Sequence, residues 1–252
     1  MENILLPSRI QYEDGDRPNE GVLIVEPCFH GYGTTLGNAL RRVLLSSLPG
    51  AAVTAMKIKG VNHEFQAVEG VKEDALEIIL NLKSLRLKCF SDEPVKLTLS
   101  TKGAKVVTAA DIEPNADVEI VNTDLVIATL TDDSKEFEME LTVRRGRGYV
   151  PSEQRSDESH DLGTIAIDAL FSPIRNVGYR VEDTRVGEIT NYDRLIMNIE
   201  TDGTITPKEA VETSSNILID YFSILTNNQA PMDFAEPVSE ANVEEPAEPE
   251  AE

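Results

Sequence analysis

The sequence predicts a soluble protein of mixed helix and strand structure, because strand and helix patterns alternate along most of the chain. Three observations support this fold class. Residues 135–144 alternate strictly between apolar and polar side chains, and apolar stripes at helical spacing lie near both ends of the chain. The hydrophobic fraction of 40% and the charged fraction of 27% are ordinary for a globular protein. The 252 residues suffice for one large domain or two modest ones.

The first expected elements are a strand and a helix. The apolar run 21–26 is typical of a strand, and we expect it to end at Pro27, which has no N–H to donate. Thr34 and Thr35 are candidate N-caps of the helix, and Pro49 would follow its end. Five apolar residues recur at helical spacing between them: Leu36, Leu40, Val43, Leu44 and Leu48. A strand near 52–59 and a helix near 71–82 should follow.

The remaining elements include the clearest strand and the clearest helix start. In the strand 135–144 every second residue is apolar, so one face should be buried: Phe137, Met139, Leu141 and Val143. Shorter strands are expected near 177–181 and 195–199. Thr206, Pro207 and Glu209 then fit the N-cap, the first helical position and the reciprocal member of a capping box. A broad apolar stripe continues from Ala210 to Leu225.

The apolar stripes of the first and last helices are wider than one sheet needs to cover. Part of each stripe could face the core and the rest a second copy of the chain, as in obligate dimers. Two ordinary core helices of a monomer would show the same periodicity, so this pattern leaves both interpretations open.

The last segment, residues 230–252, differs from the rest of the chain. It has eight acidic residues, four prolines and no basic residue. Such a segment buries too little apolar surface to offset the entropy of ordering, so we expect a disordered, solubilising tail. The net charge of -22 also argues against a general basic surface that wraps nucleic acid.

Catalytic, cofactor and metal motifs are weak or missing in the sequence. Gly31, Gly33 and Gly37 precede or open the first helix, but the spacing GxGxxxG is one residue longer than the dinucleotide fingerprint. The next strand ends at residues 57–60 (KIKG), with no acid where a ribose hydroxyl would be held. A nucleotide-cofactor enzyme therefore remains only an alternative. Cys28 and His30 lack further ligands for a metal, and the other histidines, His63 and His160, stand alone. We expect no catalytic residue, no metal and no cofactor.

The cysteines and the N-terminus indicate the compartment. Cys28 and Cys89 lie far apart without CxxC spacing, which is typical of a reducing compartment. No secretory signal is visible at the N-terminus, and the apolar runs are much shorter than the ~20 residues of a membrane span. We therefore expect a cytoplasmic protein.

Two basic islands remain in this acidic chain. Arg41 and Arg42 lie about 100° apart on the first helix, so at least one lies at the edge of the apolar stripe or outside it. An arginine there could present its donors to a partner chain or remain solvated. The other island, residues 144–151, combines Arg144, Arg145 and Arg147 with glycine and Tyr149. It fits a single-strand nucleic-acid binder or a glycine-rich loop that docks on a partner.

Several segments, in order and with similar spacing, resemble the bacterial RNA polymerase alpha subunit over the whole folded body. The first-helix segment 31–50 carries the closest resemblance. The other segments are 63–65, 69–71, 73–74, 81–83, 107–112, 145–151, 172–173 and 176–211, the last including Thr201 to Ile205.

The resemblance implies an α+β fold in two parts. A dimerisation domain would comprise residues 1–50 and 172–229, a mainly β insert domain residues 51–171, and the acidic tail residues 230–252. The first and last helices of two copies would pack together, and the homodimer would carry the beta and beta-prime subunits for DNA-templated RNA synthesis.

The resemblance also implies roles for particular residues, none of them catalytic. Arg42, with Arg41 beside it, would contact the beta subunit. Contacts to the large subunits would involve Arg147, Ile167 and Ile174. The dimer interface would include Leu36, Leu40, Leu44, Leu218 and Phe222.

One departure from the family concerns the end of the chain. Members of the family usually continue into a small helical domain that binds promoter DNA, whereas this sequence ends in the acidic tail. We therefore expect no direct promoter contact from this chain.

Overall fold

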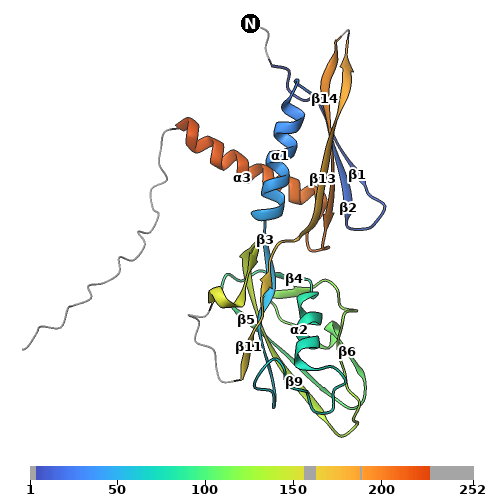
Figure 1. Cartoon of the computed structure of the whole chain (residues 1–252), viewed down its shortest axis with the longest axis vertical. Helices are drawn as coiled ribbons and strands as arrows, with labels where there is room; N and C mark the ends of the chain where they lie inside the picture. The colour runs from blue at the N-terminus through green and yellow to red at the C-terminus, as the bar shows by residue number, and fades with distance from the viewer. Residues whose placement is uncertain (1–3, 156–162, 188, 228–252) are drawn as a thin grey trace, which may run out of the picture.

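The structure, a computed structural model, describes residues 4–155, 163–187 and 189–227, which fold around two large hydrophobic cores (Figure 1). The predicted α+β fold class is confirmed. The predicted tail at 230–252 and His160 lie outside the described residues. In the part of the chain that is described, no helix has the length and apolar character to cross a membrane.

One core, here called the terminal body, is built from both ends of the described chain. Its antiparallel sheet has the order β1–β2–β14–β13. The strands are β1 (Arg9–Asp14), β2 (Glu20–Cys28), β13 (Ile174–Val186) and β14 (Ile189–Thr201). Helices α1 (Tyr32–Ser46) and α3 (Pro207–Asn227) cover one face of this sheet (Figure 1). The buried residues between helices and sheet include Leu23, Val25, Leu40, Leu44, Leu195, Met197, Ala210 and Val211.

Strand β2 does not end at Pro27, so that expectation was wrong. Cys28 pairs with Asp193 and Val25 with Leu195, which leaves two residues of β2 opposite Arg194 alone. Pro27 therefore lies in a bulge, where a missing N–H leaves no ladder hydrogen bond unmade.

The other core, the central body, lies between the two halves of the terminal body in the sequence. Its main sheet has the order β11–β3–β9–β5 and packs against α2 (Ala75–Lys83). The strands are β3 (Pro49–Ile58), β5 (Val95–Lys102), β9 (Glu136–Arg147) and β11 (Thr164–Ala166). Short pairs complete it: β4 (Leu87–Cys89) with β7 (Val118–Ile120), β6 (Val106–Thr108) with β8 (Val126–Thr129), and β10 (Tyr149–Val150) with β12 (Ala169–Leu170). Single 3-10 turns occupy Ala109–Asp111 and Ser152–Arg155.

Strand β9 confirms the alternating pattern, because all four of its predicted inward residues are buried: Phe137, Met139, Leu141 and Val143. Helix α2 begins later than predicted. The carboxylate of Asp74 accepts the N–H of Glu77 at 2.7 Å and caps the helix there. Val71 instead forms a turn, with its N–H bonded to the carbonyl of Val68.

Candidate protein-interaction surfaces

The apolar stripe of α3 is covered in its first half and uncovered in its second. Ala210, Val211 and Ser214 are buried, and Ile217 and Leu218 pack against the terminal core. The next apolar residues at the same helical spacing are exposed: Tyr221 (71%), Phe222 (59%) and Leu225 (78%). In Figure 1 this end of α3 projects away from the sheet. An exposed apolar stripe of this size is typical of a protein-interaction surface.

The start of α3 is fixed as the sequence predicts. The Thr206 N–H donates to the Glu209 carboxylate at 3.0 Å, and the Glu209 N–H donates to the Thr206 hydroxyl at 3.2 Å. The Thr206 N–H, and next the Thr206 hydroxyl at 2.8 Å from the same carboxylate oxygen, hold the pKa of Glu209 below its usual value, since both bonds favour the charged carboxylate. The cap sets where the helix begins, and therefore which turns extend beyond the sheet.

The five residues predicted for a dimer interface differ in how far their own chain buries them. Leu40 and Leu44 are buried in the core of their own chain and leave almost no surface for a partner. Leu218 packs at the edge of that core. Leu36 and Phe222 are exposed. The periodicity that marks a stripe does not show which of its positions the sheet of the same chain covers.

The two arginines of α1 lie at different positions around the helix. Arg41 and Arg42 are exposed, and neither side chain makes an ion pair or hydrogen bond within residues 4–155, 163–187 and 189–227. Arg42 lies on the side opposite the buried stripe of Gly37, Leu40 and Leu44. The expectation that at least one arginine lies at the edge of the stripe or outside it is therefore met by Arg42.

Residues 144–147 form a strand rather than the glycine-rich loop that we considered. They extend β9 along β3, with Gly146 opposite Gly50 and Arg147 opposite Pro49. A Cβ on Gly50 would lie 1.8 Å from the carbonyl oxygen of Phe171, and one on Gly146 would lie 2.6 Å from its ring. Phe171 therefore packs directly against the backbone of these two glycines, where a side chain would block it.

This packing brings together the backbone segments that carry the two basic islands, and a set of their exposed side chains is here called the contact strip. The Phe171 N–H donates to the carbonyl of Gly148 at 2.8 Å, and the Ser172 hydroxyl lies 3.5 Å from the carbonyl of Leu45. The end of α1 therefore lies beside the β9–β10 turn. The contact strip consists of Arg42, Leu45, Arg147, Tyr149 and Leu170.

The contact strip combines exposed cations with exposed apolar groups. Leu45 is 39% exposed, Tyr149 60% and Leu170 49%, and the last two are directly opposite in the β10–β12 pair. Arg147 makes no ion pair with any residue that the structure describes, whereas Arg145 binds Asp92 at 2.6 Å. Sequence reasoning missed Leu45 and Leu170 because a single apolar residue in a sequence does not reveal its exposure.

The other two residues predicted to contact large subunits lie inside the molecule. Ile167 is 2% exposed in the central core, and Ile174 is 6% exposed in the terminal core. These placements correct the prediction, because a side chain covered by its own chain has no area to offer a partner.

The glycines of α1 serve helix–sheet packing rather than nucleotide binding. A Cβ on Gly33 would lie 2.9 Å from the Cβ of Asp193, and one on Gly37 would lie 2.6 Å from the ring of Tyr179. The Gly33 N–H already donates to the Asp193 carboxylate at 3.0 Å. A negative side chain thus occupies the helix end where a phosphate would bind.

Thr34 and Thr35, the predicted N-caps, lie inside α1, which begins at Tyr32 after Gly31. The side chain that caps the helix is Asp193 instead. Asp193 comes from β14, and no signal near α1 in the sequence identifies it. Its charge adds to burial in raising the pKa of the Cys28 thiol. Among the described residues, no group of three or more His, Cys, Asp or Glu side chains could hold a metal.

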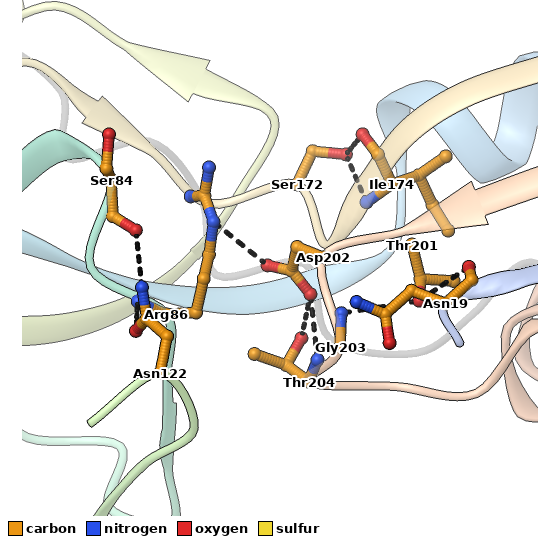
Figure 2. A network of polar contacts seen from close by, with 10 residues as sticks. All are labelled: Asn19, Ser84, Arg86, Asn122, Ser172, Ile174, Thr201, Asp202, Gly203 and Thr204. Atoms are coloured by element: carbon orange, nitrogen blue, oxygen red, sulfur yellow. Dashed lines mark hydrogen bonds and ion pairs between the residues drawn. The ribbon is translucent and has the colours of Figure 1, made fainter. Parts of the chain in front are cut away.

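A polar network joins the two bodies (Figure 2). Arg86, just before β4, places its Nε 3.9 Å from an Asp202 carboxylate oxygen in the turn before α3. The Thr204 N–H and hydroxyl donate to the other oxygen of Asp202 at 2.9 and 2.6 Å. The Arg86 N–H donates to the side-chain oxygen of Asn122 at 2.7 Å. Burial lowers the pKa of Arg86, Asp202 raises it and nearby Arg175 lowers it.

Comparison with known protein families supports one of the expectations from the sequence. Residues 56–172 match the family model described as the RNA polymerase Rpb3/RpoA insert domain. The matched segment covers the central body except for the first part of β3, residues 49–55, and also includes Phe171 and Ser172. This match confirms the resemblance found in the sequence and supports an RNA polymerase alpha-type subunit.

Proposed function

Starting from an RNA polymerase alpha-type subunit with its insert domain at residues 56–172, we propose that this chain is a homodimeric scaffold for the beta and beta-prime subunits. The observation that carries the proposal is the stripe of α3, which packs against the core as far as Leu218 and is exposed beyond it. A scaffold needs one surface to pair with its copy and another to hold larger partners, and the uncovered stripe and the contact strip can serve these roles.

A second copy of the chain is the partner that we propose for the α3 stripe. Obligate dimers bury roughly 2,000 Å² or more, with interfaces that resemble a divided core. Tyr221, Phe222 and Leu225 would supply such a core, with Leu36 of α1 beside them. The dimerisation domain would comprise residues 1–50 and 172–229, and the insert domain residues 51–171.

The contact strip is the surface that we propose for the large subunits. The guanidinium of Arg42 is exposed and has donors for carboxylate or carbonyl groups of another chain. Leu45, Tyr149 and Leu170 add apolar area around it, and aromatic and arginine side chains are enriched in interface cores. We assign Arg42 to the beta subunit and Arg147 to a large-subunit contact.

The chemistry of RNA synthesis would belong to the partners. We propose that this chain supplies no catalytic residue, works in the cytoplasm and makes no direct contact with promoter DNA. A band-shift assay on A·T-rich upstream DNA at physiological salt tests the last point, and sequence-selective binding by the isolated chain would refute it.

Replacing Phe222 with Asp tests the dimer. A charge in an apolar interface costs several kcal/mol, so we expect Phe222→Asp to sediment as a monomer that keeps its helical circular dichroism. The matched control is Ile219→Asp on the same helix, because Ile219 is 61% exposed but lies off the stripe. A Phe222→Asp dimer as stable as wild type would contradict the proposal.

Replacing Arg42 with Ala tests the contact with the large subunits. Co-expression of the tagged chain with these subunits should recover about tenfold less beta subunit from Arg42→Ala, since truncating an interface arginine commonly costs over 1 kcal/mol. Arg17→Ala serves as the control, because Arg17 is an exposed arginine in the β1–β2 turn. Equal recovery from both variants would remove Arg42 from the interface.

A further inference from the structure

A cavity of about 180 Å³ opens beside the contact strip. Buried apolar side chains line its interior: Ala52, Val53, Leu82 and Leu85. Tyr149 and Leu170, both exposed, line it as well. A cavity of about 150 Å³ suffices for a benzene-sized group, so one branched or aromatic side chain fits here.

Arg86 gives this cavity a positively charged side. The residue lines the cavity, and only its Nε lies near Asp202. The terminal nitrogens extend away from Asp202 in Figure 2 and make no hydrogen bond with any residue in the described part of the chain. They are free to donate to a group that enters the cavity.

The other charged residues of the lining are already paired. Lys83 donates to Asp168 at 3.0 Å, and the N–H of Ser152 donates to the second oxygen of Asp168 at 3.0 Å. These contacts lower the pKa of Asp168 to about 2, with the Ser152 N–H the main cause and Lys83 next. Asp168 therefore stays ionised and keeps Lys83 engaged, which leaves Arg86 as the donor for a ligand.

Positive charge is in excess around Arg86. Arg175 lies close enough to destabilise the charged form of Arg86, whereas the Asp202 carboxylate stabilises it. A carboxylate at the terminal nitrogens of Arg86 would balance this charge through charge-assisted hydrogen bonds.

We propose that this cavity receives an apolar side chain that is followed in its own chain by an Asp or Glu. The apolar group fills the space between Leu82, Leu85 and Leu170, and the carboxylate binds Arg86. The partner is the large polymerase subunit that docks on the contact strip; this identity, but not the chemistry of the cavity, rests on the proposed function.

Blocked dipeptides test the chemistry of the cavity on the full chain. N-acetyl-leucyl-glutamate amide and its glutamine counterpart are titrated while the methyl signals of Leu82, Leu85 and Leu170 are followed by NMR. The glutamate peptide should bind about tenfold more tightly, because hydrogen bonds to charged groups are the stronger ones. Equal affinities, or shifts confined to other leucines, would overturn the proposal.

Two variants separate the charge from the apolar site. Arg86→Met should abolish the preference for glutamate, while the control Arg17→Met keeps it; a preference that survives Arg86→Met would overturn the proposal. Leu170→Ser, at a half-exposed position, should weaken both peptides by a similar factor and keeps the test valid if Arg86→Met does not fold. Unchanged affinity of both peptides for Leu170→Ser would contradict the assigned cavity.

Co-expression with the large subunits distinguishes the two proposals. If wild type recovers the large subunits but does not discriminate between the peptides, the cavity proposal fails and the scaffold remains. If wild type discriminates between the peptides but recovers no large subunit, the proposed function fails and the ligand chemistry of the cavity remains.

Discussion

Helices α2 and α3 show how the two bodies differ. In α2 the apolar face is buried from end to end, with Ala75, Ile78 and Leu82 all below 2% exposed. In α3 the burial stops at Leu218, and Phe222 and its neighbours remain exposed. The central core therefore covers the whole length of one apolar face of α2, although Leu80 on the other side of that helix is 57% exposed. The terminal core covers only part of the stripe of α3, and apolar surface of that stripe is left over. A body with such a surplus is expected to gain stability from association.

The largest expected effect compares one leucine from each core. Leu141→Ala in the central body and Leu44→Ala in the terminal body should each lower the free energy of unfolding by about 2–5 kcal/mol, because both side chains are fully buried. Only the unfolding of the terminal body should depend on protein concentration, since the proposed dimerisation would stabilise that body. Urea unfolding at two concentrations, followed by probes in each body, measures this. If the unfolding of both bodies depended on protein concentration, the expected difference between the two bodies would be contradicted.

The next effect concerns the tertiary cap of α1. Asp193→Ala leaves the Gly33 N–H without its acceptor and should cost about 1–2 kcal/mol of stability in the terminal body. Burial still raises the pKa of the Cys28 thiol in this variant, but the contribution of the Asp193 charge is lost, so the thiol should react at lower pH. Unfolding curves and thiol titration check both points. An unchanged midpoint of the unfolding curve would show that the Asp193 cap contributes nothing to the stability of the terminal body.

A smaller effect is expected at the capping box of α3. Thr206→Ala removes the acceptor of the Glu209 N–H and should cost about 1 kcal/mol. Because the cap lies at the covered end of α3, the melting temperature should fall slightly. The proposed dimer should also dissociate slightly more readily in sedimentation experiments. Thr213→Ala, in the same helix beyond the cap, is the control. Equal losses from both variants would argue against a special role for the box.

The smallest effect is a pH dependence in the central body. The folded pKa of Asp168 is about 2, below the usual 3.8, so its carboxylate stabilises the fold above about pH 4 and this stabilisation is lost as the pH falls towards 2. The Asp168→Asn variant should lack this part of the acid sensitivity, and its melting temperature should approach that of wild type near pH 2. Parallel melting curves for the two proteins from pH 6 to 2 would refute the assignment.

The parts of the fold that depend on local patterns could be predicted from the sequence. The alternation in β9 and the box formed by Thr206 and Glu209 involve residues two or three apart, so the chain shows them directly. The cap of α1 could not be predicted, because Gly33 and Asp193 are 160 residues apart. Pro27 marked a strand end in the sequence, but pairing with β14 turned it into a bulge.

The candidate surfaces were predictable in kind but not in detail. Arg41, Arg42 and Arg147 stand out as cations in an acidic chain, and the structure places all three at the surface. Ile167 and Ile174 were expected at a partner and are instead buried, because sequence position gives no measure of exposure. The cavity beside Arg86 combines residues from segments around positions 52, 83, 149 and 169, and no local pattern connects them.

The sequence by itself determined the fold class, the periodicity of each apolar face, the cap of α3 and the resemblance to the alpha-subunit family, since all of these lie in short-range order along the chain. Only the tertiary structure decided which part of each apolar face is covered and that the end of α1 lies beside the β9–β10 turn. The physical reason is that burial depends on what packs against a side chain from distant segments, as Phe171 does on Gly50 and Gly146.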